Sequence, residues 1–324
     1  MEQDPEVRSF SIGENDQGKR VDRILRNLLP QYSLGSIYRM IRKGSITLNR
    51  RKVAPTHRVA EGDILTIPFA LKVKELSPLK PRSPAGLPIL YEDEDFLVLN
   101  KPKGVTAHGE HSLLPLIILY LQEKIPSSLT YTPGPLHRLD RNTTGILVFG
   151  KSLNGARLFS SALRKGLIEK QYVTILTGIL KEPARWEHIL KRDSREKRTR
   201  LETDFTDKTT GKRSTGITDV FPVAHSTLLP SGITLAVLRI HTGITHQIRA
   251  QASIEGHPLL GDIKYRSKAF RGGYFLHAFR LRMPDRLDLQ APLPMNFTST
   301  IRTLFGEQTL FGERVFPFPF PSPR

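Results

Sequence analysis

The segment from His137 to Gly145 has the clearest chemical potential in the chain, and it reads His-Arg-Leu-Asp-Arg-Asn-Thr-Thr-Gly. Its carboxylate, Asp140, has Arg138 and Arg141 close by in the sequence. Because nearby positive charges favour the ionised form of a carboxyl group, Asp140 can act as a nucleophile or as a general base. The same pattern also suits a structural Asp that caps a turn or pairs with an arginine. The segment alone leaves both roles open.

The ten histidines raise the question of a metal site. His241 and His246 are five residues apart across Gly243, and His277 is a third candidate ligand. This spacing differs from the four-residue spacing of zinc hydrolases, and no supporting Glu motif accompanies it. The lack of cysteine excludes disulfides, thiolate ligands and cysteine nucleophiles. The sequence therefore predicts no metal site.

Positive charge dominates the chain, with 49 Lys and Arg against 31 Asp and Glu and a formal net charge of +18. Such an excess favours a polyanionic partner. Residues 37–58 contain no acidic residue and seven basic ones, namely Arg39, Arg42, Lys43, Arg50, Arg51, Lys52 and Arg58. A second basic cluster comprises Lys191, Arg192, Arg195, Lys197, Arg198 and Arg200. Each cluster can follow a phosphate backbone, and the alternative for each is a solvated face.

Short helices and strands are predicted around the first basic cluster. An apolar helical face covers residues 21–29, and Ser33 is a candidate N-cap for a second helix that Gly44 ends. Strands are expected on both sides of Asn49-Arg50 and over residues 64–67. These elements predict a compact module with α and β structure.

From residue 89 onward the chain mixes strand and helix patterns. Strands are expected at 96–99, 145–149, 172–176 and 233–240, and helices at 113–121 and 156–163. Because strands and helices do not alternate regularly, the pattern indicates an α+β fold, with a mixed, largely antiparallel sheet flanked by helices and loops. Asp140 then lies in a loop that enters the sheet.

The predicted domain organisation is, in order, a polar leader over 1–18, the small α/β module over 19–76, a proline-rich linker over 77–88, the larger domain over 89–305 and an irregular tail over 306–324. Residues 1–6 are acidic and lack a signal-peptide pattern. The longest apolar run, 113–121, is far shorter than the roughly 20 residues that span a bilayer. We therefore expect a cytoplasmic protein with no membrane segment.

The nine residues from His137 to Gly145 closely resemble the catalytic motif of the RluA-type pseudouridine synthases. The likeness continues over about residues 89–285, through Glu92–Gly104, Lys170–Tyr172, Thr242–Arg249, Gly256–Asp262 and Leu276–Ala278. The basic module resembles the small alpha-L RNA-binding domain named after a ribosomal small-subunit protein, through Gly44–Asn49 and Glu61–Ile64. Arg50 departs from that family, which usually has glycine after the asparagine. The whole layout resembles the branch that modifies ribosomal RNA.

This resemblance implies an isomerase that detaches uracil from ribose, turns the base and rejoins it through carbon 5, without metal or cofactor. Asp140 matches the aspartate that attacks the sugar or removes a ribose proton. Arg249 matches the arginine that pairs with this aspartate. Tyr172 matches the tyrosine that contacts the target base by stacking, and its hydroxyl is a candidate acceptor of the proton from carbon 5.

The resemblance also implies RNA contacts. Arg138 matches the arginine thought to hold the flipped nucleotide. Ile244 departs from the family, which commonly has arginine there, and this removes one positive charge. The further expected substrate contacts are His137, which also suits a structural role, together with Thr144, Thr245, His246, Arg39, Arg42, Lys43, Arg50, Arg51 and Lys52.

The expected partner is RNA, large-subunit ribosomal RNA first and transfer RNA second, bound by a monomer. Two other functions compete with this interpretation. One is an RNA-binding or ribosome assembly factor without catalysis, and the other is a metal-dependent RNA hydrolase, for which the sequence offers no carboxylate cluster.

Overall fold

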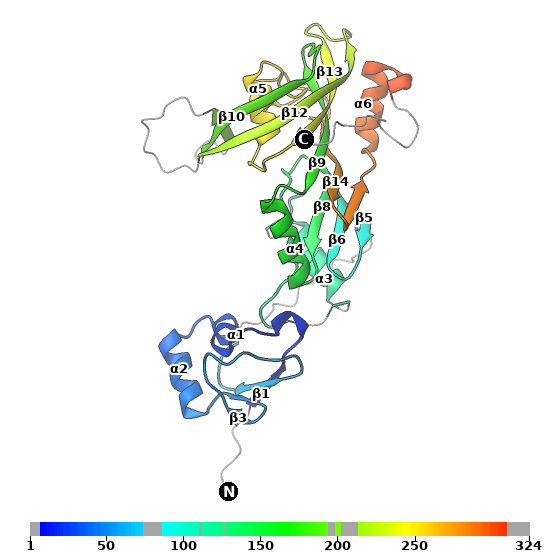
Figure 1. Cartoon of the computed structure of the whole chain (residues 1–324). Helices are drawn as coiled ribbons and strands as arrows, with labels where there is room; N and C mark the ends of the chain where they lie inside the picture. The colour runs from blue at the N-terminus through cyan, green and yellow to red at the C-terminus, as the bar shows by residue number, and fades with distance from the viewer. Residues whose placement is uncertain are drawn as a thin grey trace.

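The computed structural model describes residues 7–73, 86–109, 112–122, 124–125, 128–193, 198–201 and 213–309. A small N-terminal module lies at one end of the molecule and a larger sheet domain extends away from it (Figure 1). Most of the predicted linker, and residues 310–324 of the predicted tail, lie outside the described residues.

The module contains two helices and a four-stranded antiparallel sheet of order β1-β4-β2-β3. Its elements are β1 (Val7–Ser11), the 3-10 turn η1 (Glu14–Asp16), α1 (Val21–Leu28), α2 (Leu34–Lys43), β2 (Thr47–Leu48), β3 (Arg51–Lys52) and β4 (Ile64–Pro68). Both predicted helices are confirmed. The Ser33 hydroxyl accepts the Ser36 N–H at 3.2 Å, and Gly44 ends α2 at φ 78°. Their apolar faces share one core with the strands.

Two features of the module differ from the sequence expectation. The predicted polar leader contains β1, which pairs with β4 through main-chain groups that side-chain patterns do not reveal. The turn between β2 and β3 keeps the left-handed conformation that usually needs glycine, with φ 51° at Asn49 and 64° at Arg50. The Asn49 side chain holds this turn, because its Oδ1 accepts the Ile64 N–H at 2.8 Å.

The larger domain is built on one sheet of order β11-β10-β12-β13-β9-β14-β8-β6-β5, with β15 beside β14 and β7 beside β8. All pairs are antiparallel except β8 with β14. The strands are β5 (Ile89–Glu92), β6 (Phe96–Lys101), β7 (Gly134–Pro135), β8 (Thr144–Gly150), β9 (Glu169–Thr177), β10 (Ala184–Asp193), β11 (Arg198–Leu201), β12 (Arg213–Ser226), β13 (Ile233–Ile240), β14 (Leu276–Met283) and β15 (Leu287–Gln290). The α+β prediction with a largely antiparallel sheet is confirmed.

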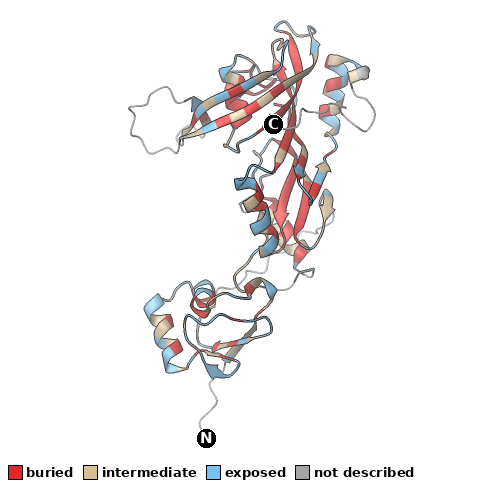
Figure 2. Ribbon diagram, viewed as in Figure 1, coloured by how far each residue is buried: buried red, intermediate tan, exposed pale blue. Residues whose placement is uncertain are grey.

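Helices cover both faces of this sheet. They are α3 (Leu113–Leu121), α4 (Leu153–Arg164), α5 (Gln247–Ile254) and α6 (Met295–Phe305), with 3-10 turns η2 (Ile263–Tyr265) and η3 (Glu307–Thr309). Because successive strand residues point to opposite faces, α3 packs on one set of β6 and β8 residues and α4 on the alternate set. In the same way α5 and α6 pack on opposite faces of β9 and β13. The central strands are therefore almost wholly buried (Figure 2).

The β10–β11 hairpin, which carries part of the second basic cluster, was not predicted from the sequence. The structure puts Lys191 and Arg192 in β10 and Arg198 and Arg200 in β11. Many residues of both strands are exposed, so their apolar periodicity is weak. Arg195 and Lys197 lie outside the described residues.

A buried carboxylate joins the module to the larger domain. Asp16 is fully buried, and its two oxygens accept the Ser128 hydroxyl at 2.9 Å and the Leu129 N–H at 2.8 Å. Nearby, the Asn15 side chain accepts the Leu153 N–H at 2.8 Å, at the start of α4. Among the described helices none has the length and apolar character needed to cross a bilayer.

Candidate active site

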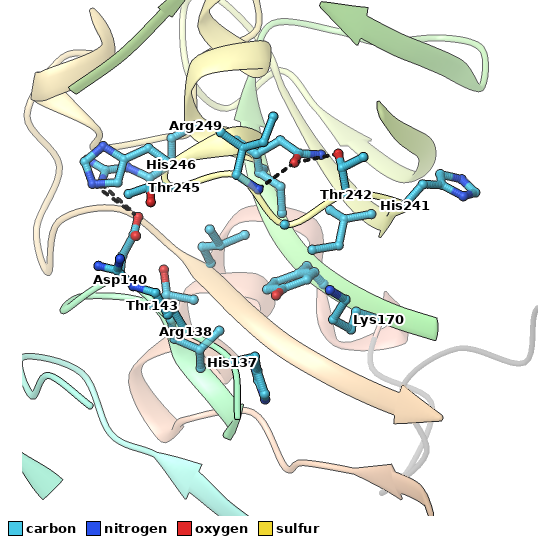
Figure 3. A pocket seen from close by; sticks show the side chains of 18 of the residues that line it. His137, Arg138, Asp140, Thr143, Lys170, His241, Thr242, Thr245, His246 and Arg249 are labelled. Atoms are coloured by element: carbon cyan, nitrogen blue, oxygen red, sulfur yellow. Dashed lines mark hydrogen bonds and ion pairs between the residues drawn. The ribbon is translucent and has the colours of Figure 1, made fainter. Parts of the chain in front are cut away.

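A cavity of about 500 Å³ opens where three segments meet: the loop before β8, the strand β9 and the loop that leads into α5 (Figure 3). Asp140, Tyr172 and Arg249 each come from one of these segments and all three line the cavity. The three residues predicted to carry the chemistry are thus brought together from positions far apart in the sequence.

The Asp140 loop is held in place by backbone groups and by a buried lysine. Lys101 is fully buried, and its ammonium donates to the carbonyls of Pro102, Val105 and Arg141 at 2.8, 2.9 and 3.1 Å. Burial lowers the pKa of Lys101 to about 8, although the charge of Asp140 acts to raise it. Since Arg141 follows Asp140 directly, these hydrogen bonds restrict where the carboxylate can lie.

Gly145, the last residue of the motif, is required by close packing. Its φ is 105°, and a Cβ at this position would lie 2.2 Å from the Ala278 carbonyl oxygen on β14. Only glycine permits β14 to approach β8 this closely at the point where the Asp140 loop enters the sheet.

Arg249 is shared between two carboxylates. Its Nη1 donates to Asp140 Oδ2 at 3.1 Å, while Nε and Nη2 donate to the two oxygens of Asp262 at 2.7 and 2.9 Å. The guanidinium carbon lies 4.9 Å from the ring centroid of Tyr265 and 4.4 Å from that of Tyr274. Burial is the largest single influence and acts to lower the pKa of Arg249, but the hydrogen bonds to Asp262 and the charges of Tyr274, Asp262 and Asp140 together raise it. Arg249 is therefore a fixed cation beside Asp140.

Tyr172 and His246 complete the surroundings of Asp140. Tyr172 is 6% exposed, and burial, followed by the charge of Asp140, raises the pKa of its hydroxyl. The Nε2 of His246 lies 3.7 Å from Asp140 Oδ2. Burial lowers the pKa of His246 to about 4, so the imidazole is neutral at neutral pH. Neither group competes with Arg249 as a charged partner of Asp140.

The other predicted contacts fall into three groups. Arg138 and Thr245 line the cavity, and Arg138 is exposed at its edge. His137 also borders the cavity, but its Nε2 accepts the Val148 N–H at 3.1 Å and its ring stacks on Phe159 at 5.9 Å. The module residues are all exposed, on α2 and around the β2–β3 turn, and none lines the cavity: Arg39, Arg42, Lys43, Arg50, Arg51 and Lys52.

Thr144 is not brought to the cavity. It is 5% exposed, and its hydroxyl lies 2.7 Å from Nδ1 of His277, whose Nε2 lies 3.2 Å from the Ala291 carbonyl. Because Nε2 must donate to that carbonyl, Nδ1 accepts the Thr144 proton. The geometry therefore gives Thr144 a structural role and supports no contact with substrate.

Sequence reasoning missed several residues of the site. Arg249 is surrounded by three of them, Asp262, Tyr265 and Tyr274. A fourth, Lys170, lines the cavity and is only 8% exposed, and burial lowers the pKa of its ammonium group. Lys170 and Asp262 lie within two segments that resemble the family, Lys170–Tyr172 and Gly256–Asp262, so the sequence did offer a signal for these two residues. In the described part of the chain, no three His, Asp or Glu side chains converge as a metal site would require.

Comparison with known proteins gives consistent matches. Residues 95–253 match a family model described as RNA pseudouridylate synthase. A Pasteurella multocida protein named ribosomal large subunit pseudouridine synthase C is 30% identical over 315 residues, covering 89% of this chain and 90% of the relative. A Haemophilus ducreyi protein of the same name is 29% identical over 327 residues, covering 93% and 97%.

A solved structure resembles the larger domain. Human RNA Pseudouridylate Synthase Domain Containing 1 superposes with a TM-score of 0.54 and 25% identity, covering 70% of this chain and 90% of that one. The architecture of this chain is therefore shared with a protein named for an RNA pseudouridylate synthase domain.

Proposed function

The chain belongs to the RNA pseudouridylate synthase family, and from this membership we propose that it isomerises uridines of large-subunit ribosomal RNA, with Asp140 as the catalytic carboxylate. The protein is thus an isomerase that acts on RNA. The observation that carries the proposed role of Asp140 is its position in the cavity, paired with Arg249 at 3.1 Å and close to the buried Tyr172.

The reaction needs a group that assists cleavage of the bond between uracil nitrogen and ribose. Asp140 can supply it in two ways, by bonding to the sugar carbon as the base departs or by removing a ribose proton. Both routes require the carboxylate form. Arg249 supports that form with a buried positive charge, and Asp262, 2% exposed, holds Arg249 in place by two hydrogen bonds.

Tyr172 is proposed to contact the detached uracil. Its ring stands on β9 and borders the cavity, so the base can stack on it during its turn. The hydroxyl is a second candidate function, because rejoining through carbon 5 requires loss of the proton there. Tyr172→Phe separates the two roles: retained turnover indicates stacking, and abolished turnover with normal RNA affinity indicates the hydroxyl.

The RNA is proposed to contact two further regions. Arg138, exposed at the edge of the cavity, is placed to hold a nucleotide that has left its stack. The exposed basic residues of the module are placed to bind the phosphate backbone and to direct the enzyme to its target. The module's identity as an alpha-L domain, a monomeric state and a cytoplasmic location belong to the same proposal.

Mapping pseudouridine in RNA from cells with and without the gene tests the proposed substrate. We expect specific uridines of large-subunit ribosomal RNA to lose the modification and to regain it when the gene is restored. Loss confined to transfer RNA would assign the enzyme to the alternative substrate. An unchanged map in both RNAs, together with impaired ribosome assembly, would favour the non-catalytic function. Purified protein should also act in the presence of a chelator, provided that the RNA is already folded.

A further inference from the structure

His246 occupies a backbone conformation that few residues adopt. It precedes the first turn of α5 with φ 58° and ψ 20°, in the left-handed region that favours Gly, Asn and Asp. With this backbone the imidazole lies beside Asp140 (Figure 3), with Nε2 3.7 Å from Oδ2. Since Arg249 already supplies the positive charge, a neutral ring in this conformation calls for another explanation.

The other imidazole nitrogen faces the hydroxyl of Tyr265. The Tyr265 oxygen lies 2.9 Å from His246 Nδ1, and it also accepts the N–H of Thr199 on β11 at 2.8 Å. Because the Thr199 N–H occupies a lone pair of this oxygen, the hydroxyl proton is free to point to Nδ1. Nδ1 then accepts, and the single ring proton lies on Nε2, the nitrogen that faces Asp140.

We propose that Tyr265 is a positioning residue for the isomerisation: its hydroxyl fixes His246 as the tautomer that directs Nε2–H to Asp140. This inference rests on the proposed catalytic role of Asp140. The contacts of Arg249 and His246 both fall on Oδ2 of Asp140, at 3.1 and 3.7 Å. The hydrogen bond from Arg249 and the longer polar contact with His246 orient the carboxylate through one oxygen and leave Oδ1 for the ribose.

The hydroxyl is itself fixed by the neighbouring hairpin. The Thr199 hydroxyl donates to the Thr245 carbonyl at 2.6 Å, so β11 is bonded to the residue before His246 as well as to Tyr265. Ile244 packs against an apolar cluster made of Leu190 on β10, Ala250 on α5 and Tyr265. Ile244, at the position where the family commonly has arginine, therefore helps to pack the β10–β11 hairpin near Tyr265.

Charged groups of both signs face the imidazole. They are Asp140 from the loop before β8, Arg249 on α5, Arg192 on β10 and Lys264 in η2. Burial is the largest influence and lowers the pKa of His246, Asp140 acts to raise it, and the three cations act to lower it further. The hydrogen bond from Tyr265 can form only while Nδ1 is unprotonated, so removing this bond should raise the pKa of His246 toward its ordinary value.

The variant Tyr265→Phe tests the proposal, because it removes one oxygen and keeps the ring that contacts Arg249. The measurement is the single-turnover release of tritium from uridine carbon 5 in RNA, between about pH 5 and pH 8. At the upper end of this pH range we expect the variant to react about three- to tenfold more slowly than the wild type, with unchanged RNA affinity. Its rate should also begin to decline at a higher pH than the wild-type rate does, because the pKa of His246 is raised.

The matched control is Tyr91→Phe, which removes a hydroxyl that donates to Asp93 Oδ2 at 2.9 Å on β5, outside the cavity. It should match the wild type at every pH. Adding His246→Gln to Tyr265→Phe removes the titrating ring, and this shift of the decline to higher pH should then disappear. A Tyr265→Phe profile parallel to that of the wild type would overturn the proposal.

A second pair of variants is independent of Tyr265. In His246→Gln the amide nitrogen can take the place of Nε2, whereas in His246→Asn it can take only the place of Nδ1. The left-handed backbone favours Asn, so a faster Gln variant cannot be attributed to backbone strain. We expect Gln to retain more activity than Asn, and the reverse order contradicts the proposal. If the wild type releases no tritium, the proposed function itself is wrong.

Discussion

The two regions proposed to contact RNA use charge in opposite ways. Beside Asp140 the cation is buried and paired: Arg249 is 6% exposed and lies between Asp140 and Asp262. In the module all six proposed contacts, from Arg39 to Lys52, are exposed. A buried ion pair fixes the direction of a carboxylate, and an exposed cluster supplies attraction without fixed geometry. Chemistry at one atom needs the first arrangement, and binding to a phosphate backbone needs only the second.

This contrast predicts that substitutions in the two regions affect different quantities. Removing a buried charge leaves its partner desolvated and unpaired, which costs stability as well as activity. Removing an exposed charge costs little stability, and its effect is on RNA affinity and salt dependence.

Arg249→Ala should have the largest combined effect. It leaves Asp262, 2% exposed, without the two hydrogen bonds that satisfy it. We expect turnover to be abolished and the free energy of unfolding to fall by about 3–5 kcal/mol, measured by urea denaturation. Arg249→Lys is the matched control, because it keeps the positive charge but lacks the planar guanidinium that donates to both carboxylates. A stable, active Arg249→Ala protein would mean that the ion pairs of the cavity are dispensable.

Neutralising the module should affect affinity and leave the chemical step intact. We expect a variant with Gln at the six exposed positions, Arg39, Arg42, Lys43, Arg50, Arg51 and Lys52, to bind the natural RNA more weakly. The dependence of log affinity on log salt should become shallower by about 0.7–0.9 for each phosphate that the variant no longer neutralises. The single-turnover rate with saturating RNA should match that of the wild type. Unchanged affinity and salt dependence would refute the proposed role of the module.

Thr144→Val should have the smallest effect, although Thr144 belongs to the catalytic motif. It leaves His277 Nδ1 without its donor in a buried site, so we expect a decrease of about 1–3 kcal/mol in the free energy of unfolding. Turnover at temperatures where the protein is folded, and the affinity for RNA, should be unchanged. A clear decrease of RNA affinity in a stably folded variant would restore Thr144 as a substrate contact.

Part of the fold followed from local patterns in the sequence, mainly the two helices of the module and the strands β6, β8, β9 and β13. The apolar spacing of residues 21–29, the Ser33 cap and Gly44 are signals that act within a few residues, and the structure confirms them. The elements that were missed include strands β1, β10, β11, β12 and β14 and helices α5 and α6. For β1 and the β10–β11 hairpin the reason is that main-chain pairing and partly exposed strands leave weak side-chain patterns.

The residues of the candidate site can also be separated into those that the sequence predicted and those that it missed. Asp140, Tyr172 and Arg249 could be predicted because each lies in a short recognisable motif. Tyr265 could not, since its importance depends on where η2 packs against the start of α5 and against β11. Thr144 is the converse case, because it belongs to the motif but its side chain does not line the cavity.

The most direct test of the proposed mechanism is the turnover of Asp140→Asn on RNA labelled with tritium at uridine carbon 5. The amide is nearly isosteric but cannot attack the sugar or remove a proton as a carboxylate can. We predict no tritium release and no pseudouridine, with RNA affinity and unfolding midpoint close to those of the wild type. Pseudouridine formation at an appreciable rate by this variant would contradict the catalytic role of Asp140, and loss of folding together with RNA binding would show that Asp140 is structural.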